Sequence, residues 1–144
     1  MENIISREYI EIIFKKYGLS VQTDDKARTK IFNKNSNLKL EILGDSILNS
    51  IITDYLIKSY DDQINIIQLR QSMMSKQSLC RLAEIIELDQ YISIPKENKE
   101  YRNNLEHFFE VFIGFLYLYL GYNLCKQFMD SIIEKEIGRI EIKI

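Results

Sequence analysis

Acidic residues set at helical spacing inside an apolar stretch constrain the fold of this chain more than any other feature. In residues 38–48, Glu41 and Asp45 stand four positions apart, so on a helix they share one face. Apolar residues occupy the neighbouring faces, which predicts a largely buried helix. A buried carboxylate costs several kcal/mol unless it is neutralised, ion-paired or bound to a metal. A divalent cation between the two carboxylates would turn their mutual repulsion into attraction.

A second apolar stretch, residues 105–116, has the same character. His107 and Glu110 stand three positions apart on one helical face. The simplest arrangement packs the two helices together, so that their polar faces meet. Gly44 and Gly114 favour this arrangement, because each costs a helix about 1 kcal/mol relative to alanine and a close helix–helix approach would justify it.

Length and composition predict one ordinary globular domain spanning residues 1–144. With 144 residues, 46% of them hydrophobic and 28% charged, the chain can bury a substantial core. The net charge of −2 does not point to nucleic acid, since nucleic-acid binders are more often basic. An RNA-binding role would therefore need a local basic patch or a metal ion. Cys80 and Cys125 are expected to be buried free thiols.

The ends of the chain and its apolar runs predict an intracellular, cytoplasmic protein. The N-terminal residues lack the basic and apolar regions of a secretory signal and do not resemble a transit peptide, although an organelle stays open. The apolar run at 108–122 is interrupted by Glu110 and falls short of the roughly 20 residues needed to span a bilayer. We therefore expect no membrane contact.

Hydrophobic periodicity predicts an all-α chain. Helices are expected over residues 4–17, 38–59, 64–73, 104–120 and 124–133, with another one capped by Ser75. Gly121 is expected to break the helical pattern near the end of the chain. Residues 33–37 and 96–104 are predicted as loops, and residues 88–94 as extended. Residues 139–144 alternate strictly, which favours a short strand or a partner-binding tail.

The apolar stretch that carries the two acids also resembles a known signature. Leu40-Glu41-Ile42-Leu43-Gly44-Asp45 is similar to the Leu-Glu-Phe-Leu-Gly-Asp core of the ribonuclease III domain. The resemblance continues in register to residues 109–118 and covers about residues 37–133 as a motif-bearing core. It implies an all-α, ribonuclease III-type endonuclease domain that forms a two-fold dimer and cuts double-stranded RNA with a divalent metal.

By this resemblance, Glu41, Asp45 and Glu110 are the catalytic residues and the ligands of Mg2+ or Mn2+. Carboxylate oxygens are the ligands that Mg2+ prefers, and a bound cation can polarise a phosphate group and activate a water. His107 stands where the family has an aspartate. It is a further candidate ligand, which Mn2+ accepts more readily than Mg2+ does.

The chain departs from the family pattern at three positions. His107, Leu38 and Gln63 each stand where the family usually has an acidic residue. These changes favour an alternative function: a ribonuclease III-like subunit that no longer cuts RNA. Such a subunit would be structural or RNA-binding, like a mitochondrial ribosomal protein or a non-catalytic partner of an active chain. In that case His107 would be ion-paired with the nearby acids. A third hypothesis is an unrelated helical interaction module, which would require both motifs to be coincidental.

The remaining partner predictions concern RNA and a second protein chain. Six basic residues are candidates for contacts with RNA phosphates: Lys26, Arg28, Lys30, Lys34, Arg70 and Lys76. The sequence shows no double-stranded-RNA-binding domain, so duplex binding is expected to be weak unless a dimer or partner adds affinity. Ile42, Leu43, Ile47 and residues 108–115 offer more apolar surface than one core needs. This surplus predicts a homodimer or a heterodimer with a related chain.

Overall fold

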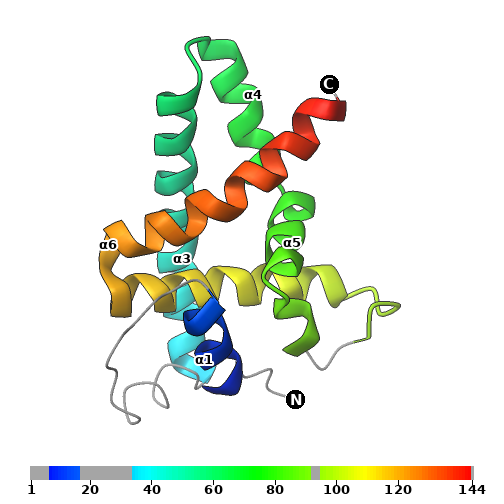
Figure 1. Cartoon of the computed structure of the whole chain (residues 1–144). Coiled ribbons are helices and arrows are strands. Elements are labelled where there is room, and N and C mark those ends of the chain that lie inside the picture. Colours follow the sequence, from blue (N-terminus) through cyan, green and yellow to red (C-terminus); the bar gives the residue numbers. More distant parts are fainter. Residues whose placement is uncertain (1–6, 17–33, 92–94, 144) are drawn as a thin grey trace.

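A computed structural model describes residues 7–16, 34–91 and 95–143, and every regular element in these ranges is helical (Figure 1). The elements are α1 (Arg7–Lys16), α3 (Lys34–Ser59), α4 (Gln63–Met73), α5 (Lys76–Ile85), a 3-10 turn η1 (Leu88–Tyr91) and α6 (Tyr101–Lys143). The predicted all-α class is confirmed. Ser75 is the N-cap of α5, as expected: its side chain accepts a hydrogen bond from the backbone N–H of Ser78.

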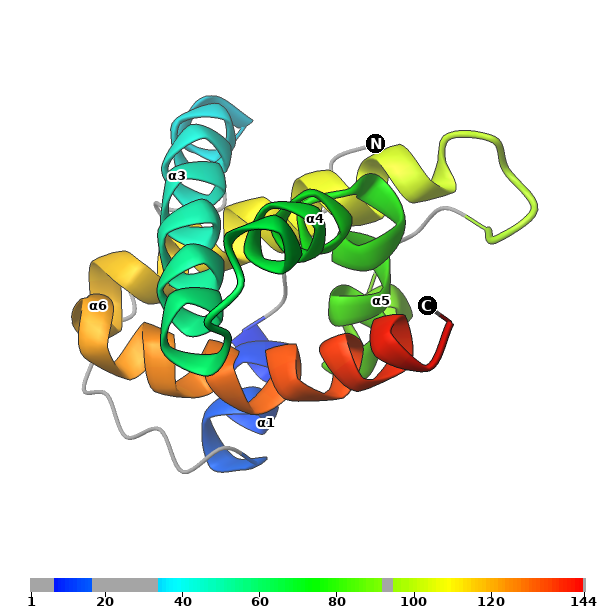
Figure 2. The same ribbon diagram turned by 90° about the horizontal axis from the view of Figure 1, so that it is seen from above.

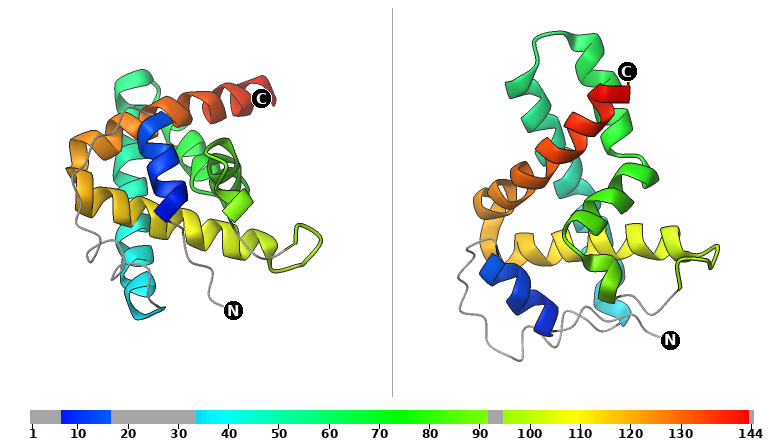
Figure 3. Two further views of the ribbon diagram at one scale, coloured as in Figure 1. Left: turned by 60° about the horizontal axis from the view of Figure 1, so that its bottom comes forward. Right: turned by 45° about the vertical axis from the view of Figure 1, so that its right-hand side comes forward.

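Helix α6 consists of two arms that meet at Gly121. This residue has φ 79° and ψ 172°, a conformation that is open to glycine and strained for other residues. We call residues 101–120 the first arm and residues 122–143 the second arm. The chain reverses direction between them, so the second arm leaves at an angle to the first (Figures 1 and 3). The predicted break at Gly121 is therefore confirmed.

Helix α3 crosses the first arm of α6 in direct backbone contact. A Cβ atom on Gly44 would overlap the carbonyl oxygen of Glu110 and lie 3.1 Å from the backbone nitrogen of Gly114. A Cβ atom on Gly114 would likewise collide with the carbonyl oxygen of Leu40. Neither position has room for a side chain. The two glycines therefore set the distance between the helices, as their positions in the sequence predicted.

The core fills the space between α3, α5 and the two arms of α6. Helix α5 lies between the arms on their open side (Figure 2). The largest fully buried side chains are Phe109, Phe112, Phe115, Ile13, Leu48, Ile51, Ile52, Leu56, Met73 and Leu79. Asp54 of α3 also pairs with Lys126 of the second arm at 3.1 Å. Both Cys80 and Cys125 are buried free thiols, as predicted.

Three local predictions about the chain between helices are wrong. Residues 101–103 were predicted as the end of a loop, but they form the start of α6. Residues 34–37 are already helical, so α3 begins at Lys34 and not at Leu38. Polar residues do not prevent a helix when apolar packing further along the same element stabilises it. Residues 88–91 form a 3-10 turn in place of an extended segment, with Leu88 buried in the core. Residues 92–94 lie outside the described part of the chain.

The prediction of a C-terminal strand or free tail is also wrong. Residues 139–143 continue the second arm of α6 as a helix. Arg139 binds Glu136 one turn earlier, and Ile140 is buried. A six-residue alternation cannot distinguish a strand from the end of a long helix that packs through only some of its positions.

The apolar surplus in residues 108–115 is used inside this chain. Each of these residues is buried in the monomer, so they offer no surface to a second chain, contrary to our expectation. The same burial explains the hydropathy of α6. By length and composition alone, α6 is long and apolar enough to cross a membrane. However, 56% of its most apolar window is buried inside the protein. In addition, Gly121 interrupts it.

Candidate active site

The crossing of α3 and α6 brings carboxylates from both helices together. Glu41 and Asp45 lie on either side of Gly44, while Glu110 stands one turn before Gly114 on the first arm. Because the backbone of Glu110 touches Gly44, its carboxylate is held next to the acidic face of α3. The sequence prediction that the polar faces of the two helices meet is therefore correct.

Glu110 is the buried member of this group, with 8% of its surface exposed. Burial raises its pKa from 4.5 to about 8, and the negative charges of Asp45, Glu106 and Glu41 act in the same direction. A hydrogen bond with Glu106 adds to the effect. Near neutral pH this carboxyl therefore keeps its proton in the absence of a cation, since too many like charges surround it.

Glu41 pairs with the single histidine of the chain. Nδ1 of His107 lies 2.8 Å from Oε2 of Glu41, which binds the first arm of α6 to α3 a second time. The Glu41 side chain is 31% exposed and that of His107 is 34% exposed. Asp45 is exposed as well. The expectation of buried acids on α3 is thus wrong, because this face of the helix borders solvent.

Glu106 is a member of the site that the sequence prediction did not include. It stands four residues before Glu110, the same spacing that singled out Glu41 and Asp45, so the signal was present. Lys76 at the start of α5 reaches this edge of the cluster. Its Nζ lies 4.0 Å from Oε2 of Glu106 and also donates a hydrogen bond to Asn103. Of the predicted RNA contacts, Lys76 therefore lies beside the carboxylates.

The other predicted RNA contacts are not brought to the cluster by the described structure. Arg70 is exposed on α4. Lys34 begins α3, but its side chain is not described. Lys26, Arg28 and Lys30 lie outside the described residues, so their role stays a prediction.

The donor atoms fit a hard divalent cation, although their present placement does not enclose one. Within residues 7–16, 34–91 and 95–143, no group of three His, Cys, Asp or Glu side chains converges closely enough to hold a metal ion. The chemistry is nevertheless suitable, because Glu41, Asp45 and Glu110 supply carboxylate oxygens. The raised pKa of Glu110 also shows negative charge that a cation would neutralise.

Comparison with known proteins gives a consistent match along the sequence. A family model described as "Ribonuclease-III-like" matches residues 6–137. "Ribonuclease 3" of Bacteroides thetaiotaomicron is 34% identical over 99 residues, covering 67% of this chain and 32% of that protein. "Ribonuclease 3" of Phytoplasma mali is 30% identical over 129 residues, covering 86% of this chain and 57% of that protein. The chain spans less than two thirds of the length of these relatives.

Solved structures match the fold. The nuclease domain of ribonuclease III from Campylobacter jejuni has a TM-score of 0.67 at 24% identity, covering 90% of this chain and 99% of that one. Dicer from Pichia stipitis has a TM-score of 0.61 at 17% identity, covering 96% of this chain and 59% of that one. At these identities the structural likeness supports the fold.

Proposed function

The chain belongs to the ribonuclease-III-like family, and we propose on this basis that it is a metal-dependent endonuclease of double-stranded RNA. Its relatives named Ribonuclease 3 support this reading, although the chain spans only part of their length. We propose Glu41, Asp45 and Glu110 as the catalytic and metal-holding residues. The intracellular location expected from the sequence stays a prediction.

The contact between Gly44 and the backbone of Glu110 carries the proposal. It forces carboxylates of two helices into one site, where Glu110 is 8% exposed and its pKa is raised to about 8. A structural role would be served better by an apolar residue or by a basic partner for Glu110. A site that gathers acidic side chains around a buried glutamate instead fits one that binds a cation and works on a phosphate.

Each side chain then has a distinct role. Glu110 must lose its proton for its carboxylate to serve as a ligand, so metal binding and proton release are coupled. Asp45 supplies an exposed oxygen ligand, and Glu41 completes the set through Oε1 while its Oε2 stays paired with His107. A divalent cation held by these oxygens supplies Lewis-acid polarisation of a phosphodiester. His107 orients Glu41 through Nδ1 and leaves its other ring nitrogen facing away from this contact.

His107 sets the metal preference in this proposal. An imidazole close to the ligands adds no negative charge, so Mg2+ should bind more weakly than it would at an all-carboxylate site. Mn2+ accepts nitrogen ligands and should lose less affinity. We propose Mg2+ or Mn2+ as the cofactor, with Mn2+ giving the higher activity.

We also propose that the chain forms a dimer. Because residues 108–115 are buried, the dimer contact must use another surface. The nuclease domain of C. jejuni ribonuclease III has a structurally flexible region that is involved in dimer formation. In this chain Ile42 is 65% exposed and Leu38 is 61% exposed, one turn apart on α3 beside Glu41. We propose that this apolar face packs against a second copy or a related chain, and that duplex RNA crosses the two acidic sites.

The test is cleavage of a long RNA duplex by the purified chain with Mg2+ and, separately, with Mn2+. The key variant is Glu110→Gln, and its matched control is Glu134→Gln, which changes an exposed glutamate on the second arm. We expect cleavage by the wild type and the control, and a loss of at least about a thousandfold in Glu110→Gln. A folded wild-type chain that binds duplex without cutting it would instead support the non-cleaving subunit.

A further inference from the structure

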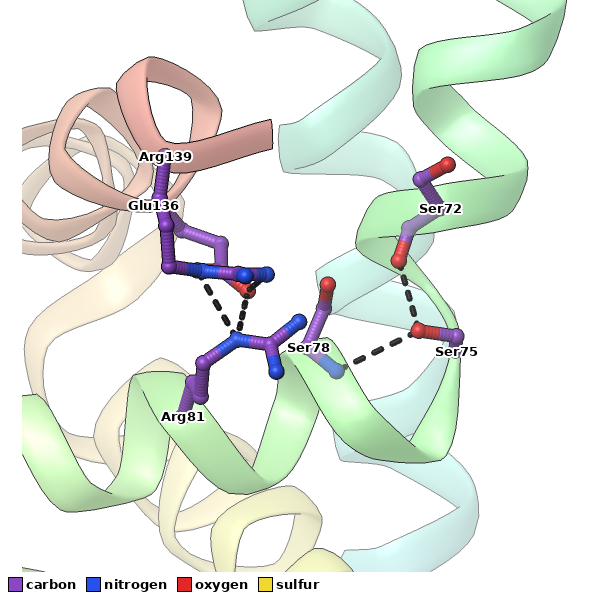
Figure 4. A network of polar contacts seen from close by, with 6 residues as sticks. All are labelled: Ser72, Ser75, Ser78, Arg81, Glu136 and Arg139. Carbon is purple, nitrogen blue, oxygen red and sulfur yellow. Dashed lines mark hydrogen bonds and ion pairs between the residues drawn. The ribbon is translucent and has the colours of Figure 1, made fainter. Parts of the chain in front are cut away.

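A second buried carboxylate, Glu136 on the second arm of α6, organises a basic cluster far along the helix from the acidic site. Its side chain is 1% exposed. Nε of Arg81 donates to both of its oxygens at 2.9 and 3.2 Å, and Arg139 donates to it through Nε at 2.6 Å and Nη2 at 3.2 Å (Figure 4). The hydroxyl of Ser78 adds another hydrogen bond. Glu136 therefore fixes two guanidinium groups in place.

The two arginines keep donors that Glu136 does not use. Among the described residues, no protein group accepts a hydrogen bond from either terminal nitrogen of Arg81 or from Nη1 of Arg139. The close-up shows the terminal nitrogens of Arg81 on the side of its guanidinium turned away from Glu136 (Figure 4). The side chains are 26% and 30% exposed, so these donors reach solvent.

Both arginines line a pocket of about 300 Å³ that is open to solvent. It is lined by Ser72, Ser75, Gln77, Ser78, Arg81, Arg139 and Ile140, and Glu136 is not part of the lining. Its volume is at the lower end of the range for small-ligand sites. The lining thus combines two guanidinium groups with hydroxyl and amide groups, and it includes no acidic side chain.

The start of α5 adds further donors to the same pocket. Ser75 caps the helix by accepting from the N–H of Ser78, while its own hydroxyl donates to the carbonyl of Ser72 at 2.7 Å. The N–H group of Gln77 belongs to the first turn, which has no intrahelical acceptor for it. The positive end of the helix dipole lies at this end of α5, where Ser75 lines the pocket.

We propose that this pocket binds a phosphate group. Two guanidinium charges against one carboxylate leave a net charge of +1, and the helix start reinforces it. Arginine forks held in advance by a buried carboxylate match the geometry of phosphate oxygens, because the planar group donates two parallel hydrogen bonds. The phosphate comes either from a small phosphorylated molecule or from the backbone of RNA. The pocket shares no residue with the acidic site, so the inference does not depend on the proposed nuclease activity.

The first test is calorimetric titration of the full chain with inorganic phosphate at constant ionic strength. The key variant is Gln77→Glu, which places a negative charge at the pocket one helical turn before Arg81 and removes no member of the Glu136 network. An acidic residue in the first turn of a helix is favourable, so the fold should be retained. The matched control is Gln127→Glu, an exposed position on the same arm as Arg139 and about 18 Å away along the helix. We expect Gln77→Glu to weaken phosphate binding about tenfold and the control to leave it unchanged.

A second variant, Arg81→Lys, keeps a positive charge for Glu136 and removes the terminal guanidinium nitrogens. We expect it to weaken phosphate binding about threefold or more. If this variant does not fold, Gln77→Glu still decides the question. Absence of phosphate binding to the wild type, or equal binding to the wild type and Gln77→Glu, would overturn the proposal.

The second arm of the test measures binding of a short RNA duplex without divalent metal. A loss of duplex affinity in Gln77→Glu, together with competition by inorganic phosphate, identifies the RNA backbone as the source. Unchanged duplex binding alongside weakened phosphate binding identifies a small phosphorylated ligand. Both results support the phosphate site, and neither requires cleavage activity.

Discussion

Helix α6 carries two buried glutamates whose surroundings differ in sign. Glu110 lies among Asp45, Glu106 and Glu41, and its pKa rises to about 8. Burial also disfavours the charged form of Glu136, but hydrogen bonds from Arg139, Arg81 and Ser78 outweigh that effect and hold its pKa below 4.5. Burial alone therefore does not tell what a carboxylate does. The charge of the neighbours decides this. The acidic neighbours of Glu110 make a site that needs a cation, whereas Glu136 already has two cationic partners, Arg81 and Arg139.

The largest expected effect tests the contact that creates the Glu110 site. Gly44→Ala would place a Cβ atom against the carbonyl oxygen of Glu110, so α3 and α6 must separate. We expect a loss of more than about 3 kcal/mol in the free energy of unfolding, measured in urea. Gly138→Ala is the control. Its Cβ would have no neighbour within 4 Å, and alanine should stabilise the helix by up to about 1 kcal/mol. Equal stability of both variants would show that the crossing tolerates a side chain.

The next prediction concerns Glu136→Gln. This change leaves Arg81 and Arg139 facing each other without the carboxylate between them, so we expect destabilisation of about 2–3 kcal/mol. Because the pKa of Glu136 is lowered, its stabilising contribution is present above pH 4.5 and is lost as the pH falls further. Urea denaturation at pH 7 and pH 3 measures both effects. A variant as stable as the wild type at pH 7 would contradict this account.

The same substitution at Glu110 should act in the opposite direction. Between pH 4.5 and about 8 the folded protein keeps a proton on Glu110 that the unfolded chain has released. The unfolded state therefore binds fewer protons, and stability falls as the pH rises through this window. Glu110→Gln removes that slope, and at pH 8.5 without metal we expect a gain on the order of 2 kcal/mol. Urea denaturation as a function of pH measures it. A destabilised variant at that pH would mean that Glu110 is already compensated.

The smallest expected effect concerns His107→Asp. This change adds a negative charge where the site pairs a histidine with Glu41. We expect Mg2+ affinity to rise about tenfold and the ratio of Mn2+ to Mg2+ affinity to fall. Calorimetric titration of each metal at pH 8.5 gives both numbers without relying on activity. His107→Asn is the control, since it adds no negative charge. Equal Mg2+ affinities in the two variants would show that the charge at position 107 does not control metal binding.

Much of the acidic site could be predicted from local spacing. Glu41 with Asp45 and His107 with Glu110 follow helical periods, and the two glycines mark the crossing point. Glu106 obeys the same rule, but it lies a full turn further from the glycine and so gave a weaker signal. Residues 108–115 were wrongly predicted as a partner surface. The number of apolar side chains can be read from the sequence. How many of them the folded chain buries depends on how the two arms of α6 pack, which the sequence alone does not show.

By itself the sequence determined the helical class, the break at Gly121, the cap at Ser75 and the pairing of the two acidic helices. The first three depend on neighbours within about one or two helical turns, where dihedral preference and side-chain period act directly. The pairing of the acidic helices was predicted from the glycine and the polar face that each helix carries locally, although the contact itself joins residues as far apart as Gly44 and Gly114. The tertiary structure alone decided which glutamate is compensated. Arg81 and Glu136 are 55 positions apart, and they meet because Gly121 turns the second arm back along α5. Long-range contacts of this kind depend on how the whole chain packs, which no local pattern records.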